Sequence, residues 1–183
     1  PHRYLAASDD HRLAHLNQAL TDPKWDAVWA VRGGFGITRI LDRLSTTGIG
    51  NKPVLGFSDL TPLLEALRST PAFGIHAPVI HSLATTDEAS RSHLFALLAG
   101  EARPIEATPW VTGSAAGPVV GGNLSLIAAT CGTAHQLDAR GAIVVLEEVG
   151  EPAYKIDRML TQCRQAGAFR GAVGFIVGQF DGC

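Results

Sequence analysis

The sequence predicts an α/β fold in which a parallel sheet alternates with helices and is followed by a β-rich α+β part. Short continuous apolar runs, typical of strands buried on both faces, alternate with segments of helical periodicity. After Gly100 the composition changes to Pro, Gly, Thr and Val with short extended runs, which indicates a second unit. The chain has 183 residues, 46% of them hydrophobic, which is enough for a sizeable core.

Helices and strands alternate along the first hundred residues. Ser8, followed by two aspartates and a periodic series of leucines, predicts a capped helix that begins there. Strands are predicted over 27–31, 53–57 and 73–78, and helices over 37–44, 59–67 and 87–98. Pro62 falls in the first turn of its helix, where a missing N–H costs little. This order of elements favours a parallel sheet.

The remaining residues predict a linker and a second unit. Residues 101–117 carry the change in composition and are predicted as the linker. Beyond it, helices are predicted over 123–132 and 153–167, and strands over 141–148 and 171–180. We therefore expect residues 1–100 to form an α/β domain and residues 118–183 to begin a β-rich domain.

Charge and cysteine content exclude several classes of protein. The net charge of −2 gives no electrostatic footprint for nucleic acid or for an anionic membrane. The sequence shows no membrane-spanning apolar run and no signal-peptide pattern at its start. Three widely spaced cysteines without a C-x-x-C predict neither a disulfide framework nor a zinc site, and favour the cytoplasm. The chain begins with Pro1 and stops just after a predicted strand, so we expect a piece of a longer protein with both domains incomplete.

The stretch Gly56-Phe57-Ser58-Asp59 places a serine where a strand turns into a helix. A nucleophile benefits from such a turn, because the helix N-terminus supplies free N–H groups and a positive dipole end for an oxyanion. The stretch is not the G-x-S-x-G motif, since Leu60 replaces the second glycine. Serine is also a common helix cap, and the pattern alone favours that explanation.

A second glycine-rich loop, "RGGFG" at 32–36, follows the strand predicted over 27–31. Paired glycines allow the backbone to approach a ligand or a neighbouring loop closely. The loop matches neither the Rossmann G-x-G-x-x-G nor the P-loop motif. Gly33 and Gly34 either form a simple tight turn or present an oxyanion donor beside Ser58, because both loops follow parallel strands and open at one edge.

Three carboxylates, Glu147, Glu148 and Glu151, follow an apolar run in the second unit. Glu147 at the end of that run is placed to orient a catalytic histidine, or to form an ion pair with Lys155 or Arg158. No H-x-x-x-H or aspartate cluster accompanies these residues, so we predict no metal site.

Seven histidines occur, and none has a spacing that declares a catalytic base. His76 alone follows a predicted strand at the candidate edge, where a single histidine is more often structural.

Taken together, these motifs resemble the LD-carboxypeptidase family, which includes the muramoyltetrapeptide carboxypeptidases and the microcin-immunity peptidases. The matching stretches follow the family's order and cover nearly the whole chain. They are "AVWAVRGGFGITRILDRL", "KPVLGFSDLTPLLEAL", "GIHAPVI", "GGNLSLIAATCGT", "GAIVVLEEVGEPAYKIDRMLTQCRQAG" and "GFIVGQF".

The resemblance implies a role for individual residues. Ser58 matches the nucleophile and Glu147 the acid of a Ser-Glu-His triad, and backbone N–H groups of Gly34 and Asp59 are the expected oxyanion donors. Gly33, Phe57 and Asn123 are the substrate-binding candidates. The implied fold joins an N-terminal α/β domain, like that of class I glutamine amidotransferases, to a C-terminal domain carrying the glutamate.

The sequence also departs from the family pattern. Phe35 and Phe57 stand where tyrosine is frequent, Glu148 where aspartate is usual, and His135 where an aromatic residue is usual. The family's triad histidine lies in a glycine-histidine stretch beyond the last strand seen here, and the family's first strand is also missing. We therefore expect the histidine outside this chain.

The implied activity is that of a cytoplasmic serine carboxypeptidase of peptidoglycan recycling, a hydrolase that releases D-alanine from murein tetrapeptides. No metal or organic cofactor is expected, the murein peptide is the expected partner, and the resemblance suggests a homodimer. One alternative is a microcin-immunity-type hydrolase of peptide–nucleotide conjugates. Another is an inactive fragment or peptide-binding module, since the base is missing; His76 as a substitute base is not favoured.

Overall fold

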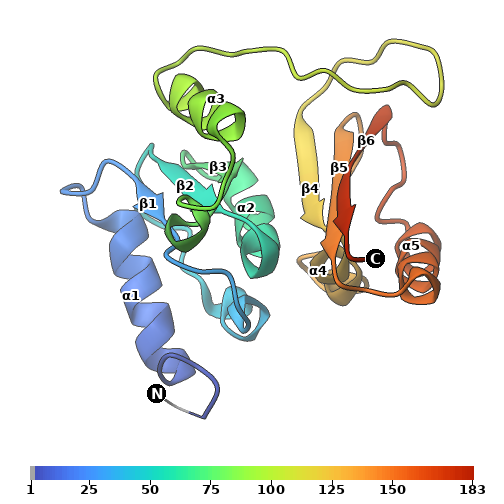
Figure 1. Ribbon diagram of the computed structural model, residues 1–183. Helices are drawn as coiled ribbons and strands as arrows, with labels where there is room; N and C mark the ends of the chain where they lie inside the picture. Colours follow the sequence, from blue (N-terminus) through green and yellow to red (C-terminus); the bar gives the residue numbers. More distant parts are fainter. Residues whose placement is uncertain (1–2) are drawn as a thin grey trace.

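The computed structural model describes residues 3–183, which form two parallel three-stranded sheets with their helices (Figure 1). The strands are β1 (Val28–Trp29), β2 (Pro53–Gly56), β3 (Phe73–His76), β4 (Val119–Asn123), β5 (Ile143–Val149) and β6 (Gly174–Asp181). The helices are α1 (Asp9–Thr21), α2 (Thr61–Ala66), α3 (Glu88–Leu98), α4 (Leu124–Thr130) and α5 (Ala153–Ala166). The α/β fold class predicted from the sequence is confirmed.

Both sheets keep the order of the sequence. The first runs β1-β2-β3 and the second β4-β5-β6, and every neighbouring pair in each sheet is parallel. Parallel strands need a crossover, and α4 and α5 supply it in the second sheet. The part of the chain beyond β4 therefore follows the α/β pattern as well. The strand ends that carry the candidate site residues are the C-terminal ends, where such sheets place ligands.

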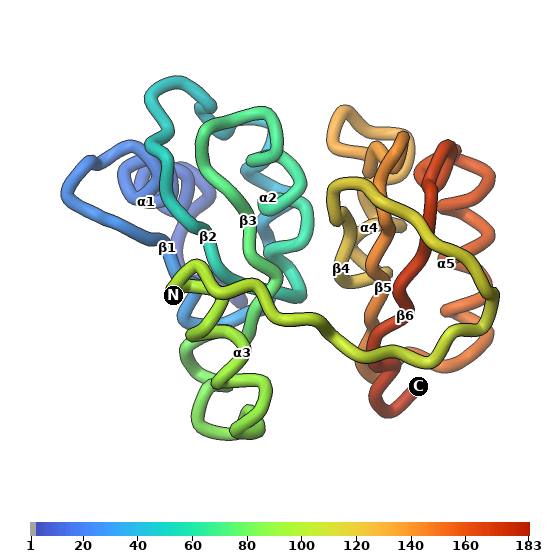
Figure 2. The backbone as a smooth tube through the Cα atoms, turned by 90° about the horizontal axis from the view of Figure 1, so that it is seen from above, coloured from blue at the N-terminus to red at the C-terminus, as the bar shows by residue number. Residues whose placement is uncertain are grey.

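The segment from Ala99 to Pro118 has no helix or strand and is exposed along its whole length. It leaves α3, arches over the gap between the two sheets and enters β4 (Figures 1 and 2). The predicted linker, 101–117, lies within this segment. The proposed division into domains at 1–100 and 118–183 stays a prediction.

Several elements differ from the sequence prediction. Strand β4 was not predicted as a strand, because its Val-Val-Gly-Gly-Asn run follows the Pro- and Gly-rich linker without a break in composition. The helix expected over 37–44 is a pair of 3₁₀ turns, Ile37–Arg39 and Leu41–Arg43, closed by bonds such as Ile40 N–H to Ile37 O at 3.0 Å. So short a segment gains little from α-helix propagation, and tertiary contacts set its geometry. The strand predicted over 27–31 is shorter, because Ala30 and Val31 accept hydrogen bonds from Ile80 and His81 instead of continuing the ladder.

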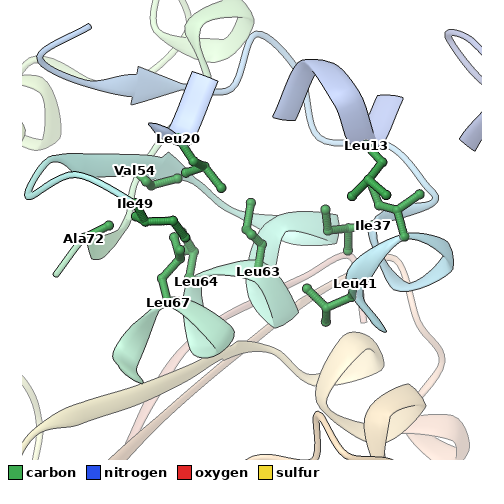
Figure 3. Close-up of a cluster of buried hydrophobic side chains, with 11 residues drawn as sticks. Leu13, Leu20, Ile37, Leu41, Ile49, Val54, Leu63, Leu64, Leu67 and Ala72 are labelled. Atoms are coloured by element: carbon green, nitrogen blue, oxygen red, sulfur yellow. The ribbon is translucent and has the colours of Figure 1, made fainter. Parts of the chain in front are cut away.

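Each sheet has its own hydrophobic core. In the first, side chains from α1, the 3₁₀ turns, β2 and α2 converge, with Leu20, Leu63 and Leu67 at most 1% exposed (Figure 3). In the second, α4 and α5 pack on β5, and Leu124 and Val144 are fully buried. Among the described residues, no helix is long and apolar enough to cross a membrane.

Helix α2 joins the two halves, because it packs on the first core and contacts β4 and α4. Thr61 Oγ1 accepts a hydrogen bond from Asn123 N–H at 3.1 Å, and Glu65 Oε1 accepts one from Gly121 N–H at 2.8 Å. The helix that follows Ser58 therefore also holds the strand that runs beside Glu147.

Candidate active site

Ser58 lies two positions after the end of β2 and has a backbone φ of +59°. Side chains rarely adopt this left-handed region, which costs roughly 1–2 kcal/mol for a residue with a Cβ. Such strain recurs in the sharp strand-to-helix turns that expose a nucleophilic serine. The conformation of Ser58 is therefore consistent with the nucleophile that the sequence predicted, and that role stays a proposal.

The hydroxyl of Ser58 does not cap a helix. Ser58 is the first residue of a 3₁₀ turn, Ser58–Leu60, which leads into α2. The cap positions are Phe57 for this turn and Leu60 for α2, and neither segment has a capping hydrogen bond from a side chain. The cap explanation that the sequence pattern favoured is wrong, because Ser58 lies inside the 3₁₀ turn and not at the cap position of either segment.

The "RGGFG" loop lies against Ser58. A Cβ added to Gly33 would lie 3.3 Å from Ser58 Cβ and 3.4 Å from Ser58 Oγ, so only a residue without a side chain fits this approach comfortably. Gly34 adopts φ +131°, which favours glycine, and a Cβ there would meet no atom within 4 Å. The two loops meet at one sheet edge, as the sequence predicted; the oxyanion role of Gly34 stays a prediction.

Asp59 connects the same two loops through its side chain. Its buried Oδ2 accepts a hydrogen bond from Ile37 N–H at 2.9 Å. This bond ties the first 3₁₀ turn after the glycine loop to the residue that follows Ser58. The backbone N–H of Asp59, predicted as an oxyanion donor, stays a proposal.

Glu147 enters the site from the second sheet. It lies on β5 opposite Asn123 of β4, and its Oε1 is buried without a hydrogen-bond partner among the described residues. The ion pair considered from the sequence is not formed in this part of the chain. Lys155 binds Glu151 at 2.9 Å, and Arg158 lies over the Tyr154 ring.

The two neighbouring carboxylates on β5 face different surroundings. Burial raises the pKa of Glu147, the adjacent Glu148 raises it further, and the Asn123 side chain opposes both. Burial also opposes ionisation of Glu148, but hydrogen bonds from Ser125, Val149 and Asn123 outweigh it and lower the pKa of Glu148. The Glu148 carboxylate is thus held by hydrogen-bond donors, whereas Glu147 keeps one oxygen without a donor.

Asn123 is 6% exposed and its side chain is engaged within the protein. Its Oδ1 caps α4 by accepting from Leu126 N–H at 3.2 Å, and its Nδ2 donates to Glu148 Oε1 at 2.9 Å. Glu148 Oε2 in turn accepts from Ser125 N–H at 2.8 Å. These contacts make Asn123 and Glu148 a buried brace beneath Glu147. The predicted contact of Asn123 with substrate stays a prediction.

His76, the last residue of β3, reaches Glu147. Its Nε2 lies 4.0 Å from Glu147 Oε1, and its ring meets that of Phe57 edge-on at a centroid distance of 6.3 Å. Burial lowers the pKa of His76. The sequence singled out His76 as the histidine nearest the candidate edge but gave no sign that it meets the glutamate.

Sequence reasoning missed Thr61 and Gly122, and it named Glu148 without its bracing role. Gly122 and Glu148 each carried a signal in the sequence. Gly122 belongs to a second glycine pair, and a Cβ on it would lie 2.9 Å from both His76 Nδ1 and Thr61 Oγ1. Glu148 stands beside Glu147, where alternation along a strand separates their environments. Thr61 offered no signal beyond its place three residues after Ser58.

Comparison with known proteins agrees with these motifs. Residues 1–77 match the LD-carboxypeptidase N-terminal domain, and residues 116–183 match the LD-carboxypeptidase C-terminal domain. A probable murein peptide carboxypeptidase of Bacillus subtilis is 36% identical over 100% of this chain and 60% of its own length.

Solved structures share the fold. Muramoyltetrapeptide carboxypeptidase from Oxalobacter formigenes has a TM-score of 0.80 and 28% identity, over 99% of this chain and 65% of that one. An MccF-like protein from Bacillus anthracis has a TM-score of 0.81 over 98% and 65%, at 20% identity, which shows the fold alone.

The chain spans about 60% of the length of the curated relatives it matches. Matches to both domains of one family, in the order of that family and with the same fold, leave a single assignment: the chain belongs to the LD-carboxypeptidase family.

Proposed function

We propose that the whole protein is a serine-type LD-carboxypeptidase that releases the terminal D-alanine of murein tetrapeptides. The observation that carries this proposal is Ser58, held at φ +59° on a strand-to-helix turn and pressed against Gly33 of the glycine loop. The names of the relatives support the substrate class, since they include a probable murein peptide carboxypeptidase and a muramoyltetrapeptide carboxypeptidase.

In the proposed reaction, Ser58 Oγ attacks the carbonyl carbon of the bond between the diamino acid and D-alanine. The Ser58 proton passes to a histidine that the family resemblance places outside residues 1–183. Backbone N–H groups of Gly34 and Asp59 stabilise the oxyanion, and the histidine returns the proton to the leaving amine of D-alanine. Water, activated by the same histidine, then hydrolyses the acyl-enzyme and frees Ser58.

Glu147 has the acceptor that this scheme requires. A triad carboxylate accepts a hydrogen bond from the histidine and stabilises the imidazolium that forms during the reaction. Oε1 of Glu147 is buried and has no partner among residues 3–183, so it is free to accept from an additional donor. No metal or organic cofactor enters the scheme. A homodimer and a cytoplasmic location remain predictions.

The first experiment measures D-alanine release from a purified murein tetrapeptide by the complete gene product. We expect the Ser58→Ala variant to lose on the order of 10³-fold or more in kcat while it stays folded. Ser114→Ala, in the exposed segment between the sheets, is the matched control and keeps wild-type activity. D-alanine release by Ser58→Ala at the wild-type rate would refute the proposal.

The alternative substrate class is tested in the same assay. Peptide–nucleotide conjugates, the substrates expected of a microcin-immunity-type relative, are offered beside the tetrapeptide at equal concentration. A higher kcat/KM for the conjugate, with the same dependence on Ser58, would keep the serine mechanism and replace the substrate. We expect the tetrapeptide to be preferred, because the similarity to the MccF-like protein extends only to the fold.

A further inference from the structure

His76 lies where the two halves of the molecule meet. Its Nε2 points to Glu147 of β5 across a distance of 4.0 Å. Its Nδ1 side packs against Gly122 of β4, where an added Cβ would lie 2.9 Å from Nδ1 and 3.1 Å from Cε1. The ring edge meets Phe57, the residue before Ser58. One imidazole therefore touches both sheets and the nucleophile loop.

The atom that faces His76 is the same atom that lacks a partner. Among residues 3–183, Glu147 Oε1 is the buried side-chain oxygen without a hydrogen bond, and His76 Nε2 lies 4.0 Å from it. Buried polar atoms are nearly always paired, so an exception calls for an explanation. A shift of about 1 Å in either side chain brings the pair to hydrogen-bond length.

We propose that His76 is a positioning residue, a neutral imidazole that directs its Nε2–H to Glu147 Oε1 and fixes the carboxylate for the triad histidine. The inference rests on the proposed function, since it concerns the same site. Burial lowers the pKa of His76, which keeps the ring neutral with one N–H to donate near neutral pH. The edge-on contact with Phe57 links that orientation to the loop that carries Ser58.

Geometry separates this role from that of a general base. Nε2 faces Glu147, and the Nδ1 edge lies against Gly122, where a side chain would collide with the ring, so the ring is held at the contact between the two sheets. A carboxylate oxygen accepts more than one hydrogen bond, so His76 leaves room for the triad histidine. The groups that act on the Glu147 carboxylate are His76 from β3, the Asn123 amide from β4 and, through its charge, the neighbouring Glu148 on the opposite face of the same strand.

The test uses two substitutions in the complete gene product. His76→Phe keeps the ring volume and the contact with Phe57 but removes the donor. His76→Gln places an amide N–H close to the position of Nε2. We expect His76→Phe to lower kcat about tenfold or more with KM changed less than about twofold, and His76→Gln to stay within about threefold of wild type.

The pH profile gives a readout that a merely structural role would not move. Loss of the donor disfavours the ionised Glu147, so the inflection of the kcat/KM profile that reports protonation of Glu147 moves to higher pH in His76→Phe and returns in His76→Gln. If His76→Gln fails as badly as His76→Phe, or if both fall to the level of Ser58→Ala, the positioning role is refuted.

A second measurement needs no substrate. The carboxyl carbon of Glu147 is titrated by ¹³C NMR, with its signal identified by its absence in Glu147→Gln. We expect a higher pKa of Glu147 in His76→Phe than in wild type and His76→Gln; equal values in all three would overturn the inference. A wild type that releases no D-alanine but shows this pattern would refute the proposed function and leave the role of His76 supported.

Discussion

Ser58 holds a reactive side chain on a backbone conformation that disfavours side chains. Its φ of +59° is shared in the described chain by one other residue that is not glycine, Arg3. Natural proteins keep such strain where the surrounding structure enforces it, and β2, Gly33 and the buried Asp59 surround this turn. The strain positions the hydroxyl and costs folding stability.

The cost of this strain predicts how two variants differ. Ser58→Ala keeps the Cβ and the strain, whereas Ser58→Gly removes both. Glycine normally destabilises a folded protein relative to alanine by roughly 0.5–1 kcal/mol, because the unfolded chain gains freedom. We expect the opposite order here, with Ser58→Gly more stable than Ser58→Ala by about 0.5–1 kcal/mol in urea denaturation. The usual order, with alanine the more stable, would show that the strain is smaller than the entropic cost of glycine and would contradict the prediction.

Strand β5 gives two adjacent glutamates opposite properties. Successive side chains of a strand point to opposite faces, so Glu147 faces the candidate site while Glu148, 3% exposed, turns into the protein. Glu148 receives hydrogen bonds from Asn123, from Val149 N–H and from both Ser125 groups, the N–H and the hydroxyl. The strand, rather than either residue type, decides which carboxylate is braced and which is available.

The stability of the folded protein at pH 7 should therefore change in opposite directions when Glu147 and Glu148 are each replaced by glutamine. The pKa of Glu147 is raised in the fold, so its ionised form opposes folding above that pKa; Glu147→Gln should raise the melting temperature by a few degrees at pH 7. The pKa of Glu148 is lowered, so its contribution is present above the ordinary glutamate pKa and fades as pH falls through the lowered one. Glu148→Gln should cost about 1–3 kcal/mol at pH 7.

The two variants, Glu147→Gln and Glu148→Gln, serve as controls for each other. Denaturation at pH 7 and again about one unit below the ordinary glutamate pKa should show both differences shrinking in acid, because wild type is then protonated at Glu147 in both states and increasingly so at Glu148. Shifts in the same direction for both variants at pH 7 would contradict the opposite assignment of the two side chains.

At the scale of the whole molecule, the sequence predicts most helices and strands well, but it does not predict the contact of α2 with β4 that joins the two halves. Buried strands such as Pro53–Gly56 are visible as continuous apolar runs, and Ser58 is visible as a turn motif. The meeting of His76 and Glu147, 71 positions apart, depends on how α2 packs against β4, which no local pattern encodes. The misassigned 37–44 helix also depends on a contact that is distant in sequence, since the buried Asp59 carboxylate fixes its start.

One buried residue at the contact between α2 and β4 makes it possible to separate an effect on folding stability from an effect on the alignment of the site. Thr61 is 1% exposed, and its Oγ1 accepts from the backbone N–H of Asn123, which lies opposite Glu147 in the second sheet. Thr61→Val keeps the shape and leaves that N–H unpaired, which should cost about 1–3 kcal/mol. Because the bond sets the second sheet against the helix after Ser58, we also expect kcat for D-alanine release to fall roughly tenfold.

Thr130→Val is the matched control for this variant. Thr130 is also buried, but its hydroxyl donates within α4 to Ile127 O, away from the contact between α2 and β4. It should lose stability without losing kcat, and Thr61→Ser, which keeps the hydroxyl, should retain most of the wild-type rate. Equal falls in kcat for Thr61→Val and Thr130→Val would mean that destabilisation alone limits the rate. A fall confined to Thr61→Val would instead show that the Thr61–Asn123 bond, one of two between α2 and β4, brings nucleophile and carboxylate into register, a task that neither sheet performs by itself.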